Sequence, residues 1–372
     1  MRTRRNILNI LFFTMMATAL LPLATAQQAP ATSDWRNGRI AFGGCGVTNC
    51  DVYTLNPDGT ALHQVTHDAS SFHPDRSPDA VHIAYASVAS GFVAIWVADA
   101  DGANVRQLTP DDPTSFNVWP CFMPDGRTIL YTNCLGQGCD GGISAIDIDG
   151  TNQRVILTPR IGESYNNAVP SSDGKRLAFM KWHVKGDLMR IYLLRLGTTP
   201  ERAVTSRELE GYDPDWSPDG TKVLFVSNVN RPNRAIYSIR PDGEDLQQLT
   251  YPKFPMDDWS AAYSPNGARI AFTSNRRYPD KCCSDLFTMR ADESDGYNDA
   301  EGEQRRQTQR IPVPLSYAAD PRWGIAPLLT EATVNVSAAT ANPGAVPPGR
   351  ATAMRNVCRG FPALARTPLC RK

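Results

Sequence analysis

The sequence has no excess of charge of either sign, because 38 Lys and Arg balance 38 Asp and Glu over 372 residues. If residues 1–26 are removed on export, as argued below, three arginines are lost and 35 basic residues face 38 acidic ones. Nucleic-acid-binding domains generally carry a strong basic excess. The composition therefore argues against a nucleic-acid partner.

Long apolar runs are absent after residue 26, so the sequence offers no later candidate for a membrane-spanning helix. Motifs of the common enzyme classes are also missing. We find no Gly-x-Ser-x-Gly nucleophile elbow, no Cys-x-x-Cys-His, no His-Glu-x-x-His and no phosphate-binding loop. These absences exclude a serine peptidase domain and favour a non-catalytic protein.

The first residues have the pattern of a signal peptide. A basic start, Met1–Arg5, is followed by the apolar run Ile7–Leu23 and by the sequence Ala-Thr-Ala at residues 24–26. We expect cleavage after Ala26 and a periplasmic or secreted mature protein that is not integral to the membrane. The arginine pair fits both a general secretory and a twin-arginine signal.

A four-residue turn motif of the type Ser-Pro-Asp-Gly recurs every 46 to 48 residues. Its five copies are Ser77–Ala80, Met123–Gly126, Ser171–Gly174, Ser217–Gly220 and Ser264–Gly267. Proline presets φ at the second position of such a turn, and glycine tolerates its exit. An apolar segment follows each copy, as Ile83–Tyr85 follows the first, and a sixth segment, Ile40–Phe42, opens the series.

Each unit continues with a third strand, and in four of the six units an Asp-Gly turn and a short fourth strand that ends in Leu-Thr or Val-Thr follow. Four short antiparallel strands that are apolar on both faces cannot bury those faces alone, and they stack radially as blades. The sequence therefore predicts an all-β protein with a six-bladed β-propeller of four-stranded antiparallel blades over residues 36–325. The first unit lacks a leading strand, so we expect residues 317–325 to close the ring.

This repeat resembles that of the TolB propeller family over residues 36–325. TolB is the periplasmic protein of the Tol-Pal system, so the resemblance implies a binding protein of the cell envelope. TolB carries an α/β domain ahead of its propeller, and the resemblance here covers the propeller alone. Related repeats form the propellers of prolyl oligopeptidase-like peptidases and of some polysaccharide lyases, so the fold is implied more strongly than the function.

Nine cysteines in an exported chain predict disulfides and one unpaired thiol. Cys45 with Cys50, and Cys134 with Cys139, have identical spacing across equivalent loops, so we expect two disulfides within loops. A metal site is the alternative for these four cysteines. Residues 326–372 are expected to form a Pro- and Ala-rich linker and a basic tail.

The remaining cysteines leave more than one pairing open. The adjacent Cys282 and Cys283 could form a vicinal disulfide or bond separately to Cys358 and Cys370 of the tail. A tail disulfide between Cys358 and Cys370 is the favoured arrangement. It leaves Cys121 as a buried thiol in an inner strand.

Propeller geometry separates two faces of the ring. We call the face with the short first-to-second and third-to-fourth strand turns the turn face, and the face with the other two sets of connections the loop face. Irregular connections on a rigid scaffold are where binding residues accumulate, so we expect a protein partner to bind the loop face. Candidate contact residues there are Trp182, Arg276 and Tyr278.

Alignment of the inner strands places six residues in one column that should ring the mouth of the channel. They are His73, Trp119, Asn167, Asp213, Ser260 and Asp320. No cofactor is predicted, although the His and Asp side chains of this column could hold a cation such as calcium or a polar group of a ligand; otherwise they cap strands and bind water.

The sequence as a whole favours an exported, non-catalytic propeller that binds a protein in the periplasm or cell envelope. The alternative is a metal-assisted lyase, lactonase or hydrolase that acts on sugars at the channel mouth.

Overall fold

The computed structural model describes residues 38–45, 49–135, 141–183, 189–198, 200–228, 233–278, 283–292, 308–315 and 317–323. The chain divides into two units, residues 1–34 and 35–372, and every described residue belongs to the second. The expected signal peptide at residues 1–26 and the tail at residues 326–372 lie outside the described residues.

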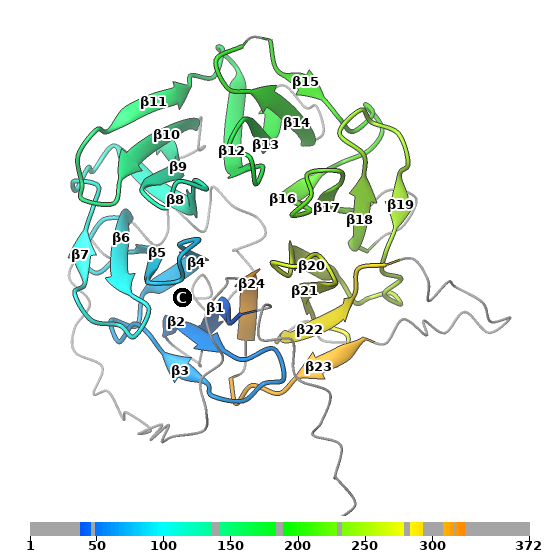
Figure 1. Cartoon of the computed structure of the whole chain (residues 1–372), viewed down its shortest axis with the longest axis horizontal. Coiled ribbons are helices and arrows are strands. Elements are labelled where there is room, and N and C mark those ends of the chain that lie inside the picture. The colour runs from blue at the N-terminus through cyan, green and yellow to red at the C-terminus, as the bar shows by residue number, and fades with distance from the viewer. Residues whose placement is uncertain are drawn as a thin grey trace, which may run out of the picture. The chain divides into compact units, whose positions relative to one another are not determined.

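Regular structure in the described part of the chain consists of β-strands, which form six four-stranded antiparallel sheets (Figure 1). Blades one to three contain, from the axis outward, β24 (Tyr317–Trp323), β1 (Ile40–Cys45), β2 (Cys50–Leu55) and β3 (His63–Gln64); β4 (Ser71–Arg76), β5 (His82–Ser87), β6 (Ala94–Asp99) and β7 (Arg106–Gln107); and β8 (Ser115–Phe122), β9 (Thr128–Leu135), β10 (Gly142–Asp147) and β11 (Arg154–Leu157). Blades four to six contain β12 (Glu163–Pro170), β13 (Arg176–His183), β14 (Arg190–Arg195) and β15 (Arg202–Ala203); β16 (Tyr212–Trp216), β17 (Val223–Ser227), β18 (Ala235–Ile239) and β19 (Gln247–Gln248); and β20 (Asp258–Tyr263), β21 (Arg269–Ser274), β22 (Asp285–Arg290) and β23 (Gln309–Ile311). The predicted fold class is confirmed.

The recurring turn motif owes its form to a small hydrogen-bond network. In the first copy, the Ser77 hydroxyl donates to Oδ1 of Asp79 at 2.5 Å, and the same oxygen accepts from the amide of Val81 at 3.0 Å. The Ser77 oxygen in turn accepts from the amide of His82 at 2.9 Å. Serine and aspartate therefore satisfy the backbone groups where the chain reverses, which explains their recurrence.

The threonine that ends the fourth strand has an equally specific role. Thr66 accepts through Oγ1 from the amide of Val52 in the third strand at 2.9 Å, and Thr109 accepts from Ile95 at 2.9 Å. Thr205 and Thr250 make the same bond in blades four and five. The short outer strand is thus attached to its neighbour beyond its two or three ladder residues.

Strand β24 completes blade one by pairing antiparallel with β1, from Ile40 opposite Trp323 to Cys45 opposite Tyr317. Figure 1 shows the last strand, in orange, beside the first, in blue. The prediction that a C-terminal strand closes the ring is confirmed. A closed ring leaves no inner sheet edge open to a second chain.

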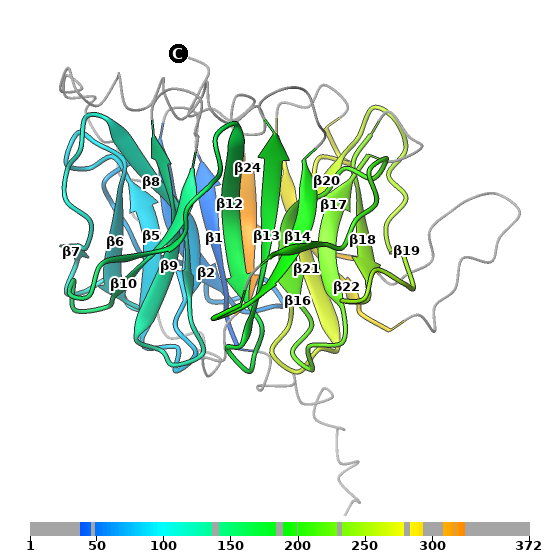
Figure 2. The same cartoon turned by 90° about the horizontal axis from the view of Figure 1, so that it is seen from above.

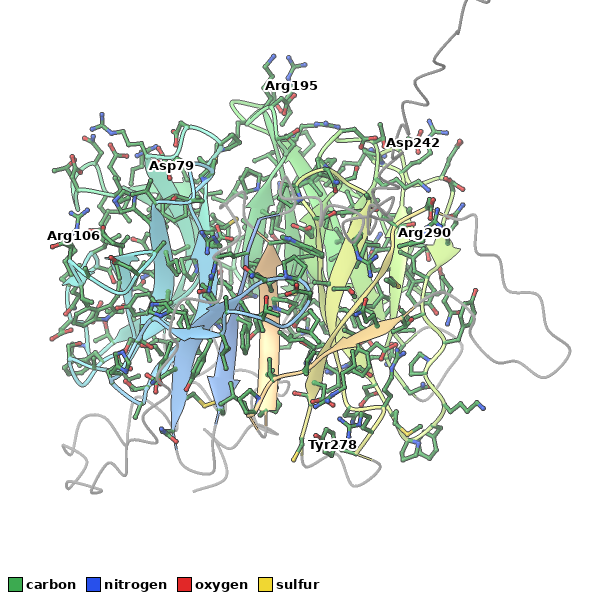
Figure 3. The ribbon with its side chains drawn as sticks, turned by 60° about the horizontal axis from the view of Figure 1, so that its bottom comes forward. Asp79, Arg106, Arg195, Asp242, Tyr278 and Arg290 are labelled. Atoms are coloured by element: carbon green, nitrogen blue, oxygen red, sulfur yellow. A yellow bond between two sulfur atoms is a disulfide. The ribbon has the colours of Figure 1, made fainter. Side chains whose placement is uncertain are left out.

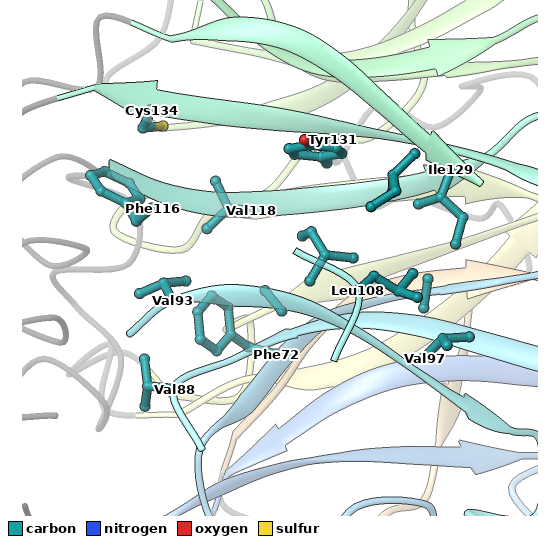
Figure 4. Packing of buried hydrophobic residues seen from close by; sticks show 14 of the residues in the cluster. Phe72, Val88, Val93, Val97, Leu108, Phe116, Val118, Ile129, Tyr131 and Cys134 are labelled. Atoms are coloured by element: carbon teal, nitrogen blue, oxygen red, sulfur yellow. The ribbon is translucent and has the colours of Figure 1, made fainter. Parts of the chain in front are cut away.

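Apolar side chains fill the spaces between adjacent blades. Between blades two and three, Phe72 and Val97 pack with Val118 and Ile129 in one buried cluster (Figure 4). Burial of one such side chain contributes about 1.5 to 3 kcal/mol. The two apolar faces of each blade, which the sequence pattern requires, are covered in this way.

One disulfide is resolved, between Cys45 at the end of β1 and Cys50 at the start of β2, as the spacing predicts. Cys134 is also disulfide-bonded. Its expected partner, Cys139, lies outside the described residues, as do Cys282, Cys358 and Cys370. Cys121 is a buried free thiol in β8, as expected.

The strands run from one face of the ring to the other (Figure 2). Asp79 and Asp242, in turns of the turn face, lie on the opposite side of the ring from Tyr278 (Figure 3). Where the structure is described, the chain contains no helix with the length and hydrophobicity needed to cross a membrane.

Candidate functional site at the ring axis

Each inner strand contains one non-glycine residue in the left-handed backbone region, with φ between 48° and 52°. These six residues are His73, Trp119, Asn167, Asp213, Ser260 and Asp320, the column that the alignment predicts. Each lies at a register shift in its ladder, where two inner-strand residues oppose one residue of the second strand. A bulge at the same place in every blade re-aims one side chain per blade.

All six side chains line one cavity at the ring axis, together with Arg322. The space open to the centre of a water molecule is about 20 Å³. That volume holds ordered water, whereas pockets for small organic ligands measure about 300 Å³ or more. The cavity in this conformation therefore suits water or a small ion and not a sugar.

Four of the column residues form a hydrogen-bonded chain around the axis. Asn167 donates through Nδ2 to Oδ1 of Asp213 at 3.3 Å. The Ser260 hydroxyl donates to Oδ1 of Asp320 at 2.8 Å and lies 3.4 Å from Oδ2 of Asp213. Burial raises the pKa of both carboxyl groups, and the Asp320 charge further raises that of Asp213.

His73 continues this chain toward blade three. Its Nε2 lies 3.5 Å from Oδ2 of Asp320, and its ring stacks on that of Trp119 with centroids 5.2 Å apart. Burial lowers the pKa of His73 to about 3, so the imidazole is neutral at pH 7. Its Nδ1 has no hydrogen-bond partner among the described residues.

A second layer of charge lies beside the column, and the sequence analysis did not identify it. Asp75 and Asp215 accept hydrogen bonds from the amides of Phe122 and Tyr263 in the next blades, at 2.7 and 2.8 Å. Arg322 places Nη1 3.6 Å from Oδ1 of Asp215. Burial raises the pKa of Asp215 to about 6, although the Arg322 charge opposes the shift.

The sequence did contain a signal for this layer. Asp75, Asp215 and Arg322 each stand two residues after a column residue, in the segments His-Pro-Asp, Asp-Pro-Asp and Asp-Pro-Arg. Residues at the same position of repeated blades occupy equivalent places around the ring. The charges could have been assigned to the axis from that spacing.

The idea that the column binds a cation finds no preformed ligand cluster in the described residues. No group of three or more His, Cys, Asp or Glu is arranged there to hold a metal ion. His73 and Asp320 approach each other directly, whereas Asp213 is linked to them only through Ser260.

The three predicted contact residues of the loop face are partly covered. Trp182 lies near the end of β13, opposite Ser164, and is half-buried. Arg276 forms an ion pair of 2.9 Å with the fully buried Asp258, and its guanidinium lies 4.8 Å from the ring centre of Phe287. Arg276 is therefore part of the interior of blade six as well as of its surface.

Tyr278, the third predicted contact residue, is half-buried beside Arg277, whose guanidinium lies 5.9 Å from its ring centre. Two residues other than the three predicted contacts are more accessible. Ile161 is fully exposed, and Phe254 is 67% exposed. Both lie in connections from a fourth strand to the next blade, on the loop face.

Comparison with known proteins agrees with this architecture. A family model described as the TolB beta propeller domain matches residues 140–295. A TolB homologue from Chlorobium chlorochromatii (strain CaD3) is 31% identical over 145 residues, which cover 39% of this chain and 31% of that protein. The uncharacterized peptidase YuxL of Bacillus subtilis (strain 168) is 28% identical over 192 residues, which cover 51% of this chain and 26% of the peptidase.

The chain thus spans less than a third of either relative's length. Among solved structures, TolB from Acinetobacter baumannii superposes with a TM-score of 0.61 at 19% identity, over 77% of this chain and 66% of that one. The family match within the ring, the related sequences and the shared architecture together identify this ring as a TolB-like six-bladed β-propeller.

Proposed function

We propose that this protein is an exported, non-catalytic binding module of the periplasm or cell envelope that recognises a protein partner with its loop face. The observation that carries the proposal is the exposure of Ile161 and Phe254 on that face. Apolar and aromatic side chains of this size dominate the energy of protein interfaces when a partner covers them. The likeness to TolB supports an envelope location.

The narrow cavity at the axis supports binding over catalysis. The alternative, a metal-assisted lyase, lactonase or hydrolase, would need room for a sugar beside the column residues, and the space there is about 20 Å³. Metal analysis of the purified protein separates the two. A stoichiometric, tightly bound metal would favour the enzyme.

A comparison of the two faces tests the binding proposal. A partner isolated by cross-linking in cells would be purified, and its affinity measured for Ile161→Ser with Phe254→Ser. The matched control is Val81→Ser with Leu246→Ser, since these apolar residues on the turn face are 51% and 47% exposed. Loss of hot-spot contacts worth about 2 kcal/mol corresponds to a roughly 30-fold weaker affinity.

We expect the control pair to bind within about twofold of the unmodified protein. Tyr278→Ala is a useful third change on the loop face. Arg276 is a poor choice for this purpose because its replacement would leave the buried Asp258 without its cation. If only the turn-face pair, Val81→Ser with Leu246→Ser, loses binding, the partner binds the turn face and the proposal is wrong.

A further inference from the structure

Two arginines are buried together where blade one packs on blade two. Arg39 precedes β1 and is 4% exposed, and Arg76 ends β4 and is 6% exposed. The two strands are in close contact, because a Cβ added at Gly43 would lie 4.0 Å from Cα of Phe72. Both arginines lie at the turn-face ends of their strands.

Neighbouring groups accept hydrogen bonds from only some of the N–H groups of each guanidinium. Arg39 donates through Nη2 to Oγ1 of Thr54 at 2.7 Å and to the carbonyl of Ala61 at 2.8 Å. Arg76 donates through Nη2 to the carbonyl of Ala80 at 3.2 Å. Within the described residues, Nη1 of Arg39 and both Nε and Nη1 of Arg76 have no acceptor, and neither arginine forms an ion pair.

The carboxylate nearest in sequence, Asp75, opposes the shift in the pKa of Arg76 through its charge, but among the described residues it forms no ion pair with either arginine. Asp75 accepts through Oδ2 from the amide of Phe122 in the next blade, at 2.7 Å. Burial lowers the pKa of Arg39 and Arg76 to about 10, with the Arg39 charge adding to the shift of Arg76. Both guanidiniums are still charged at pH 7, so two positive charges lie side by side.

The repeat shows what usually occupies this junction. Between blades four and five, the equivalent of Arg39 is Arg176, and its guanidinium lies 4.5 Å from the ring centre of Trp216. Arg176 also donates to the carbonyl of Gly220, the equivalent of Ala80. Arg76 therefore occupies the position of the aromatic ring of Trp216. It also donates to the carbonyl of Ala80, whose equivalent in blade five, Gly220, accepts from Arg176.

Across all six junctions, which lie within the described residues, only this one places arginine before the turn. The residues at that position in the other blades are Phe122, Pro170, Trp216, Tyr263 and Trp323. A cation on an aromatic ring is stabilised without a counterion, whereas two buried cations require one. With Arg76 at this position, the junction between blades one and two contains two cations in place of a cation packed on an aromatic ring.

We propose that Arg39 and Arg76 bind a small oxyanion, a carboxylate or a phosphate, at the turn face between blades one and two. The flat guanidinium group matches the paired oxygens of such anions, and three nitrogen atoms without an acceptor are available to donate to them. Binding an anion supplies the missing counterion. The two sources are a free inorganic oxyanion and a small organic acid.

The test is thermal unfolding of the purified mature chain with up to 10 mM phosphate, sulfate or succinate, balanced by chloride at constant ionic strength. Saturation of one site should raise Tm by on the order of 3 °C above chloride. Equilibrium dialysis with labelled phosphate should show one bound ion per chain. A response to succinate alone assigns the site to a carboxylate, and a response to phosphate and sulfate assigns it to an inorganic oxyanion.

Variants show where the anion binds. Arg76→Trp rebuilds the arrangement of blade five, so its Tm without anion should exceed that of the unmodified protein and its response to oxyanions should vanish. Arg39→Gln should also abolish the response, and Arg176→Gln should retain it in full. No effect of any oxyanion on the unmodified protein, or an unchanged response in Arg76→Trp and Arg39→Gln, would overturn the proposal.

Discussion

Arg322 and Asn167 join opposite sides of the ring: Nη2 of Arg322 in blade one donates to Oδ1 of Asn167 in blade four at 3.3 Å. The same guanidinium places Nη1 3.6 Å from Asp215 in blade five. The strand that closes the ring therefore also brings a positive charge to its axis, where the column and the second layer contain four aspartates, Asp75, Asp213, Asp215 and Asp320.

Replacing this arginine should destabilise the ring. We expect Arg322→Gln to lower the free energy of unfolding by about 3 kcal/mol at pH 7, because Asp215, whose pKa is about 6, loses its cation. Urea unfolding measures the difference. The effect should shrink at pH 5, below the pKa of about 6 for Asp215, since a protonated carboxyl group no longer needs the charge.

Arg195→Gln is the matched control, because Arg195 is exposed on the turn face (Figure 3). It should change stability by no more than about 0.5 kcal/mol. Equal urea midpoints for the two variants at pH 7 would show that Arg322 is not an electrostatic link.

Ring closure can be tested by shortening the chain. A chain that ends before Ala319 loses most of β24, so blade one loses its inner strand and β1 becomes an open edge. We expect a lower Tm and a broader unfolding transition. A chain that ends after Ile325 keeps all of β24 and should unfold at the temperature of the full mature chain; the closure model fails if the two truncations behave alike.

Asp51 predicts a pH-dependent stability. Burial, and secondarily the neighbouring Asp68 carboxylate, raise its pKa from 3.8 to about 7. Between these values the folded protein holds a proton that the unfolded chain releases, so this group's contribution is complete below pH 4 and is lost as the pH rises to 7. Between pH 4 and 7 the ionisation of Asp51 should lower the free energy of unfolding of the parent protein by about 2 to 4 kcal/mol. We expect this decrease to be absent in Asp51→Asn.

Urea unfolding between pH 4.5 and 7.5 gives the slope of the free energy of unfolding against pH for parent and variant. The difference between the two slopes is the contribution of Asp51. His73 contributes a slope of opposite sign, because its pKa falls from 6.5 to about 3, and the subtraction cancels it. Asp79→Asn is the control, since the pKa of Asp79 is lowered and its window lies below pH 4. If parent and Asp51→Asn have the same slope, Asp51 is ionised throughout.

The second loop disulfide is a prediction for peptide mapping. Non-reducing digestion should yield a fragment that contains Cys134 linked to Cys139, as well as the Cys45–Cys50 fragment. Cys121 should react with a maleimide only after unfolding, because its thiol is buried. Recovery of Cys134 joined to a cysteine of the tail would refute the pairing by loop.

The repeat, the closing strand and the column were predictable because each depends on local chemistry that recurs in register. Ser77 with Asp79 and the segment at Asp320 are examples. The role of Arg276 was not predictable, since its partner Asp258 comes from an adjacent strand and no periodic pattern links them. The Arg39 and Arg76 pair was visible in the sequence but becomes significant only when the blade contact is known.

The pairing of Ile40 with Trp323 also has a consequence for how the protein folds. Strand β1 cannot pair with β24 until almost the whole propeller has been synthesised. The contact that completes the ring therefore joins residues far apart in the sequence and carries a large loop-closure cost. Until residue 323 is available, β1 presents an unpaired edge. Ring completion is thus expected to be a late and slow step, during which the incomplete propeller is most exposed to association with other chains.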